Sequence, residues 1–229
     1  IQTTAKGFNI GAAVPGARLT DHKALKKAWP GVVEAANLIG SDQIQGRCTL
    51  AGNLCNASPA ADSVPAMIAA GAKAVIVGAK KRRTVPVEKV AIGPGQTCLG
   101  SDELIESIAL PKPGPRTGDA YLRFIPRTEM DIAVVGVAVC VTLERGRVKS
   151  ARVALGAVAP TAVLVPAAAR AIVGTSLDDE ALEKLSRACS AACNPIDDKR
   201  GTVEYRTRLA GVLAKRAAKI AFSRAGGNS

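Results

Sequence analysis

The chain has 229 residues, of which 48% are hydrophobic and only 3% aromatic, and its formal net charge at pH 7 is +12. A chain of this length supports one large domain or two small ones, with a core that must consist mainly of Ala, Val, Leu and Ile. No apolar run is long enough to span a bilayer, and the first residues do not resemble a signal peptide. We therefore expect a cytoplasmic protein without a membrane span.

The positive charge makes nucleic acid a candidate partner. The cationic residues are, however, spread along the chain, and no aromatic side chains that could stack on bases alternate with them. The densest run, Lys80–Arg83, is predicted to be a solvated hairpin tip. We expect no nucleic-acid partner, although a basic surface would suit an acidic redox partner or an anionic dinucleotide.

The first half of the chain is predicted to mix strands and helices. Strands are expected at 8–14, 74–77, 84–87 and 103–110, and helices at 21–29, 32–38 and 59–70. Pro94-Gly95 marks a loop, and the proline-rich segment 111–115 marks a domain boundary.

The second half is predicted to begin with strands and to end with helices. The strands are expected at 120–125, 133–143 and 148–158, with a tight turn at Arg145-Gly146, and the helices at 163–173, 179–192 and 202–221. The apolar stripe of the last helix is predicted to be Tyr205, Leu209, Val212, Leu213 and Ile220.

The predicted fold class is α+β. An antiparallel sheet with helices occupies residues 1–113, and an antiparallel three-stranded sheet packed with a helical bundle occupies residues 114–225, followed by a tail at 226–229.

Six cysteines raise the question of a metal site or a disulfide. No C-x-x-C spacing occurs and His22 is the only histidine, so we expect neither. Cys189 and Cys193 would share a helix face, and Cys140 falls in an apolar strand, where a thiol behaves as a small hydrophobe. We interpret His22 as a surface residue, and no nucleophile lies beside a base, so hydrolysis and group transfer are not supported.

One segment of small and polar residues, Thr49–Asp62, has the most informative chemistry. It is interpreted as a loop that leads into a helix, with Ser58 as the N-cap, Pro59 at the first helical position and Asp62 in the first turn. Main-chain N–H groups and small side chains suit a phosphate, whereas a carboxylate can accept hydrogen bonds from sugar hydroxyls. The alternative is an ordinary well-capped helix, and the pattern by itself leaves both open.

The segment resembles the signature T-x-G-G-N…N-A-S-P-x-x-D of the FAD-binding (medium) subunits of molybdenum hydroxylases. This family includes the carbon monoxide dehydrogenase flavoprotein and the flavin domain of xanthine dehydrogenase. Three further motifs resemble the family in the same order, at Asp102–Pro111, Arg123–Ala133 and Glu204–Leu213. The resemblance covers nearly the whole chain and implies the second lobe of a two-lobed FAD-binding domain, followed by the C-terminal domain of these flavoproteins.

The resemblance also implies roles for single residues. Those that would line the phosphate and ribityl region of FAD are Thr49, Ala51, Gly52, Asn53, Asn56 and Ser58. Asp62 would bind a ribityl hydroxyl, and Leu104 would contact the isoalloxazine edge or else pack in the core. Arg123 would place a cation near the ring or else form a surface ion pair. Arg127 and Asp131 are expected to form a structural salt bridge.

The function implied by the resemblance is electron transfer. The chain would bind FAD and pass electrons to NAD, a quinone or another acceptor. These electrons would arrive from a large molybdenum-cofactor subunit through the [2Fe–2S] clusters of a small iron–sulfur subunit, within a dimer of heterotrimers.

Two features depart from the family pattern. No A-G-G-T loop, which holds the flavin pyrophosphate in the first lobe of the family, precedes Thr49. Ala51 replaces the first glycine of the G-G pair, which would add a methyl group where backbone and phosphate should meet. A truncated chain, a first lobe supplied by another polypeptide and a homologue without flavin all fit these residues. The alternative function is therefore a flavin-free structural or assembly subunit.

Overall fold

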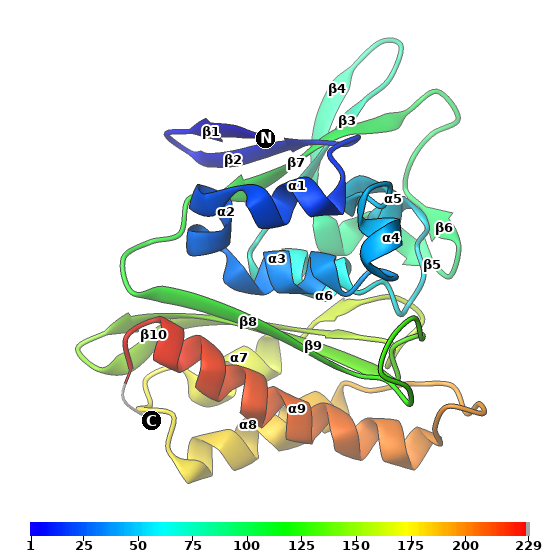
Figure 1. The fold of residues 1–229 in the computed structure, drawn as a ribbon. Coiled ribbons are helices and arrows are strands. Elements are labelled where there is room, and N and C mark those ends of the chain that lie inside the picture. Colours follow the sequence, from blue (N-terminus) through cyan, green and yellow to red (C-terminus); the bar gives the residue numbers. More distant parts are fainter. Residues whose placement is uncertain (228–229) are drawn as a thin grey trace.

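The chain folds into four alternating layers of sheet and helix, which Figure 1 shows stacked from top to bottom. The computed structural model describes residues 1–227, so the last two residues of the predicted tail 226–229 lie outside the described residues. None of the helices in residues 1–227 combines the length and the hydropathy that a membrane crossing requires.

The first layer is a five-stranded antiparallel sheet with the order β1-β2-β7-β3-β4. Its strands are β1 (Gln2–Thr4), β2 (Gly7–Gly11), β3 (Lys73–Val77), β4 (Arg82–Pro86) and β7 (Leu104–Pro111). The four strands predicted in the first half are confirmed, with shifted ends. The short strand β1 escaped prediction because all three of its residues are exposed and carry no apolar pattern.

The second layer consists of six short helices that cover one face of this sheet (Figure 1). They are α1 (Gly16–Asp21), α2 (Lys23–Ala28), α3 (Pro30–Asn37), α4 (Asp42–Gln45), α5 (Leu50–Cys55) and α6 (Ser63–Ala69). The helix predicted at 21–29 corresponds to α2 with shifted ends, whereas α1 was not predicted. The chain breaks between them at His22, whose Nδ1 accepts a hydrogen bond from Leu25 N at 3.1 Å and caps α2. A 3-10 turn (Val87–Lys89) and the hairpin of β5 (Ala91–Gly93) and β6 (Gln96–Thr97) complete this half.

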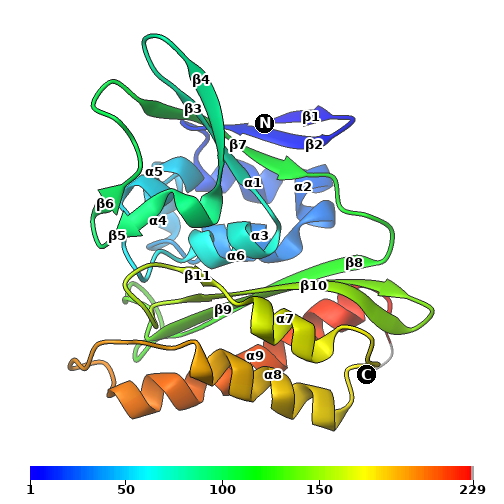
Figure 2. The same cartoon turned by 180° about the vertical axis from the view of Figure 1, so that it is seen from behind.

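The third layer is an antiparallel sheet with the order β11-β10-β9-β8. Its strands are β8 (Thr117–Phe124), β9 (Val135–Glu144), β10 (Arg147–Gly156) and β11 (Val163–Leu164). The predicted turn at Arg145-Gly146 is confirmed, and both residues have positive φ, as a two-residue hairpin loop requires. The prediction of three strands is wrong, because β11 pairs with the end of β10, as Figure 2 shows.

The fourth layer consists of α7 (Pro166–Ile172), α8 (Asp179–Ala191) and α9 (Val203–Arg224). The predicted stripe of α9 is only partly right: Leu213 is buried and Leu209 packs against the core, but Tyr205 and Ile220 are 43% and 36% exposed. The face buried against the sheet and α8 consists mostly of small residues and includes Ala210, Gly211, Ala214, Ala217, Ala218 and Ala221. A methyl group on Gly211 would clash with Ser186 of α8. Helices α8 and α9 therefore lie so close together at this point that only small side chains fit between them.

Polar contacts join the two halves across the middle of the molecule. Helices α3 and α6 pack on the face of the second sheet opposite to α8 and α9. Arg152 donates from Nε and Nη2 to the Ile68 carbonyl near the end of α6, at 3.0 and 2.8 Å. Arg224, at the end of α9, forms an ion pair with Glu34 of α3. The division at residues 113–114 stays a prediction, and the second sheet contributes residues to the cores on both of its sides.

Asp119 of β8 supports the start of α3 from across this boundary. The residue is 3% exposed. Its Oδ2 accepts a hydrogen bond from Val32 N at 3.1 Å, whereas its Oδ1 has no hydrogen-bond partner among residues 1–227. Burial raises the pKa of this carboxyl from 3.8 to about 6. The folded state therefore holds this proton more tightly, and the stability contributed by the group falls as the pH rises from about 4 to 6.

We expect Asp119→Asn to remove this part of the pH dependence while its amide oxygen still accepts from Val32. Asp119→Ala, which leaves that N–H without an acceptor, should lower the free energy of unfolding by about 1–2 kcal/mol at pH 5 and by less at pH 7.5, because the variant also lacks the titrating carboxyl. Urea unfolding at the two pH values measures both effects. An Asn variant with the same pH dependence as the unaltered protein would contradict the assignment.

Candidate cofactor site

The segment expected to be a loop, Thr49–Asn56, is a short helix. Thr49 has extended backbone angles and caps α5, because its Oγ1 accepts from Gly52 N at 2.8 Å. Leu50, Ala51 and Leu54 are buried on one side of this turn and a half of helix. Prediction missed the helix because Gly52 and Asn53 are weak helix formers typical of loops, and six residues are too few to show a helical period.

The helix corrects the expectation about Ala51. Its side chain is 5% exposed and belongs to the core, whereas Gly52 is exposed. The extra methyl group therefore points into the protein and not toward the surface where a phosphate would bind. A Cβ on Gly52 would lie 3.0 Å from Thr49 Oγ1, so glycine leaves the capped surface of α5 bare.

The helix after the signature begins at Ser63, and the predicted start at Pro59 with Ser58 as N-cap is wrong. Ser58 Oγ accepts from Ala60 N at 3.2 Å within a turn. The first turn of α6 is held by Asn53, whose Oδ1 accepts from Ser63 N at 3.1 Å and from Ser63 Oγ at 2.7 Å. Asn53 thus joins α5 to α6 through the middle of the signature.

Asp62 precedes α6 but turns its side chain away from the helix, toward β8. Its Oδ2 accepts from Arg123 Nη1 at 2.7 Å, and its Oδ1 accepts from the Tyr121 hydroxyl at 3.2 Å. We call these three residues the Asp62 cluster. The side chains of Asp62 and Arg123 are 11% and 7% exposed, so the expected surface ion pair of Arg123 is in fact buried.

Burial dominates the electrostatics of the Asp62 cluster. It raises the pKa of Asp62 from 3.8 to about 6, although the charge of Arg123 and the hydrogen bonds from Arg123 and Tyr121 lower it. Burial and the neighbouring Asp62 likewise raise the pKa of Tyr121 well above 10. The cluster at neutral pH is therefore an ion pair with a neutral tyrosine as a hydrogen-bond donor.

Leu104 is the first residue of β7, and its side chain is 58% exposed. This excludes the alternative in which Leu104 packs in the core. The strand start is held by Glu103, which accepts two hydrogen bonds from Arg83 at 2.8 and 2.6 Å. These bonds lower the pKa of Glu103 to about 2. Arg83 is therefore not part of a solvated tip, whereas Lys80 and Lys81 are exposed there as predicted.

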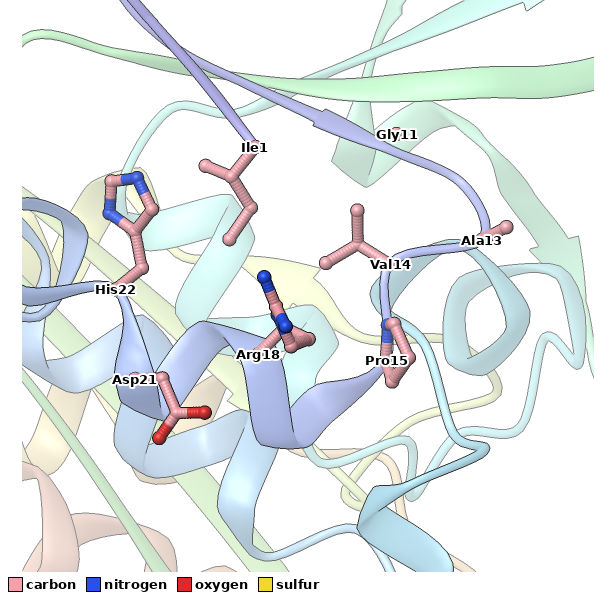
Figure 3. A pocket seen from close by; sticks show the side chains of 8 residues that line it. All are labelled: Ile1, Gly11, Ala13, Val14, Pro15, Arg18, Asp21 and His22. Carbon is pink, nitrogen blue, oxygen red and sulfur yellow. The ribbon is translucent and has the colours of Figure 1, made fainter.

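A cavity of about 710 Å³ lies beside α1 and was not predicted. Figure 3 shows Arg18 pointing toward the space between Ile1 and Val14. Pro15 also lines the cavity and forms an isolated bridge with Thr49, so the cavity adjoins the signature segment. The helix α1 that carries Arg18 lacks a side-chain N-cap, which removes the usual sequence signal for its start.

Ser58 and Asn56 lie apart from that cavity. Ser58 lines a second cavity of about 410 Å³ between the two halves, together with Ile132 and Arg206. Asn56 is exposed at the C-terminal end of α5. None of the predicted site residues lines the first cavity; Thr49 adjoins it through Pro15, and Ser58 lines the second.

The other chemical predictions concern thiols and ion pairs. Cys140 is buried as expected, and Cys193 Sγ donates to the Cys189 carbonyl at 3.2 Å. In residues 1–227, no group of three His, Cys, Asp or Glu side chains could hold a metal ion. The predicted pair of Arg127 and Asp131 is confirmed at 3.4 Å.

Comparison with known proteins places this geometry in a family. Residues 1–113 match the family described as FAD binding domain in molybdopterin dehydrogenase, and residues 120–221 match the CO dehydrogenase flavoprotein C-terminal domain. The carbon monoxide dehydrogenase medium chain of Hydrogenophaga pseudoflava is 33% identical over 94% of this chain and 75% of its own length. The chain belongs to the family of molybdenum-hydroxylase medium subunits.

Other members of the medium-subunit family agree with this assignment. The xanthine dehydrogenase FAD-binding subunit of Escherichia coli O157:H7 is 29% identical over 96% of this chain and 76% of its own length. Carbon monoxide dehydrogenase from Oligotropha carboxidovorans superposes with a TM-score of 0.91 at 32% identity, over 94% of this chain and 75% of that structure. The resemblance found in the sequence and the expected α+β fold are confirmed.

Proposed function

We propose that this medium subunit holds FAD against a surface formed by α5, Leu104 and the Asp62 cluster, and that it passes electrons to an acceptor. The observation that carries the proposal is the buried Asp62 carboxylate, which leaves its own helix to be held by Tyr121 and Arg123. Each of its oxygens keeps a lone pair for a further hydrogen bond.

The residues present fit FAD. Gly52 leaves bare backbone beside the cap of α5, and the methyl group of Ala51 is turned into the core. Leu104 presents an apolar side chain at the start of β7, against which α5 packs. Arg18 lies in the cavity next to Thr49 and would add a positive charge for the diphosphate.

Each residue then has a distinct task toward the bound cofactor. Thr49, Gly52, Asn53 and Asn56 would hold the phosphate and ribityl region. The Asp62 carboxylate would accept a hydrogen bond from a ribityl hydroxyl, and Leu104 would cover the edge of the ring. The chemistry that FAD supplies is reversible electron transfer. Arg123 would hold the Asp62 carboxylate toward that ribityl hydroxyl, and the two charges of this pair balance each other.

The expected partners are a large molybdenum-cofactor subunit and a small iron–sulfur subunit, arranged as a dimer of heterotrimers. The named relatives are medium chains or FAD-binding subunits, which supports a place in such a complex. The acceptor in this proposal is NAD, a quinone or another oxidant, and the location is the cytoplasm. The inward orientation of Ala51 removes one argument for the flavin-free alternative.

The test compares two substitutions of exposed apolar residues. We expect Leu104→Asp to weaken FAD binding by about tenfold or more, because it places a charge against an apolar ring edge. Val173→Asp is the matched control, since Val173 is 43% exposed at the end of α7 in the fourth layer. FAD binding is measured by visible absorbance and flavin fluorescence after reconstitution of the flavin-free full-length subunit. If the unaltered subunit binds no FAD, the proposal is wrong.

A further inference from the structure

A buried tyrosine and a glycine opposite it complete the site in a way that the family motifs do not indicate. We propose that Tyr121 and Gly136 are positioning residues of the flavin site. Gly136 leaves the space through which the Tyr121 hydroxyl reaches Asp62, and Tyr121 then fixes the orientation of that carboxylate. This inference rests on the proposed binding of FAD at Asp62.

The register of the second sheet brings the two residues together. In the β8–β9 pair, Tyr121 lies opposite Ala138, and Gly136, two residues before Ala138 on β9, lies opposite Arg123. Tyr121 and Gly136 are thus diagonal neighbours on one face. A Cβ on Gly136 would lie 2.5 Å from the Tyr121 hydroxyl oxygen and 3.2 Å from Cζ. The ring therefore passes directly over the glycine.

The glycine has no other evident purpose in this strand. Around it, β9 is rich in valine, and Val135, Val137 and Val139 are all buried. Glycine in the interior of a strand weakens it and commonly marks the close approach of another group. Here that group is the hydroxyl of Tyr121, a residue that is 4% exposed.

The tyrosine and the arginine hold Asp62 from two sides. Tyr121 donates to Oδ1 and Arg123 donates to Oδ2, so the carboxylate cannot rotate without losing a buried hydrogen bond. With Arg123 alone, the carboxylate could turn to place both oxygens on the guanidinium and away from a ligand. The titratable groups that act on Asp62 are these two residues, both on β8.

The experiment measures the dissociation constant of FAD between pH 5 and pH 8 for the full-length subunit and its variants. Ionised Asp62 is the better acceptor, so binding should weaken as the pH falls through its titration midpoint. We expect Tyr121→Phe to raise the dissociation constant about tenfold at pH 7.5. The midpoint should also move to higher pH, because the carboxylate loses a stabilising hydrogen bond. Tyr205→Phe, at an exposed position on α9, is the matched control.

Gly136→Ala provides an independent test, because its methyl group should displace the tyrosine hydroxyl. The variant should reproduce both effects of Tyr121→Phe. The double variant should bind FAD about as well as Tyr121→Phe, because the phenylalanine lacks the oxygen at 2.5 Å and its ring carbons need to shift by only a few tenths of an ångström. A thermal unfolding curve checks that each variant folds.

A measurement without FAD distinguishes the hydrogen bond between Tyr121 and Asp62 from the role of these residues in FAD binding. The carboxyl ¹³C shift of Asp62 in the flavin-free protein reports its midpoint without any FAD. If Tyr121→Phe changes neither that midpoint nor the FAD affinity, Tyr121 only fills space and the inference is wrong. If the midpoint moves but the unaltered subunit binds no FAD, the hydrogen bond is real and the flavin role of both residues is rejected.

Discussion

Replacing Arg206 by alanine is expected to lower the free energy of unfolding by about 3–5 kcal/mol, the largest effect of any substitution proposed for this chain. Arg206 is 3% exposed at the start of α9. It donates to the Val134 carbonyl at 2.8 Å and to Asp198 at 2.6 Å, and Nε donates to the Gly201 carbonyl at 3.3 Å. Alanine would leave these acceptors unpaired and release the loop before α9 from the start of β9.

Urea unfolding measures this loss, and two variants make it specific. Arg206→Lys should recover only part of the stability, because one ammonium group cannot reproduce the fork of a guanidinium. Arg208→Ala, two residues further on at an exposed position of the same helix, should change stability by less than about 0.5 kcal/mol. Equal effects of the two alanine substitutions would show that the buried contacts of Arg206 contribute little.

Replacing Arg123 by methionine is expected to cost about 3 kcal/mol of stability at pH 7.5, because it leaves the Asp62 carboxylate buried without its cation. FAD affinity should also fall, since the Asp62 cluster loses one of its two anchors. The loss of stability should be much smaller at pH 5, where the carboxyl takes up a proton and no longer needs a cation.

The direction of this pH dependence follows from the pKa of Asp62. In the unaltered protein it rises from 3.8 to about 6 on folding, so this group favours the folded state at low pH, and its contribution falls as the pH increases through that range. Without Arg123 the folded pKa should rise further, which extends the loss to higher pH.

Urea unfolding at pH 5 and pH 7.5 tests this prediction. The double variant Asp62→Asn with Arg123→Met removes both charges and should recover most of the stability at pH 7.5. A cost for Arg123→Met that does not change with pH would exclude an unpaired carboxylate as its cause.

Local patterns predicted most of the strands. The alternation in 103–110 and the apolar runs at 133–143 and 148–158 with Arg145-Gly146 between them correspond to β7 and the β9–β10 hairpin. The errors fall where contacts distant in sequence decided the outcome. In α9, close packing on β8, β9 and α8 buries a row of alanines together with Leu213 and leaves Tyr205 and Ile220 outside, although their hydrophobicity favoured burial.

The sequence by itself determined the family and the α+β class, because these depend on motifs and on local periodicity, and it named the candidate residues of the proposed flavin site. Only the tertiary structure decided how those residues are used. Ala51 points into the core because α5 is a helix. Asp62 is hydrogen-bonded by Tyr121 and Arg123, which lie 59 and 61 residues away in the chain, on the second sheet. Gly136 matters only because strand pairing places it under Tyr121. Burial and the pairing of distant charges arise from packing, which no local pattern records.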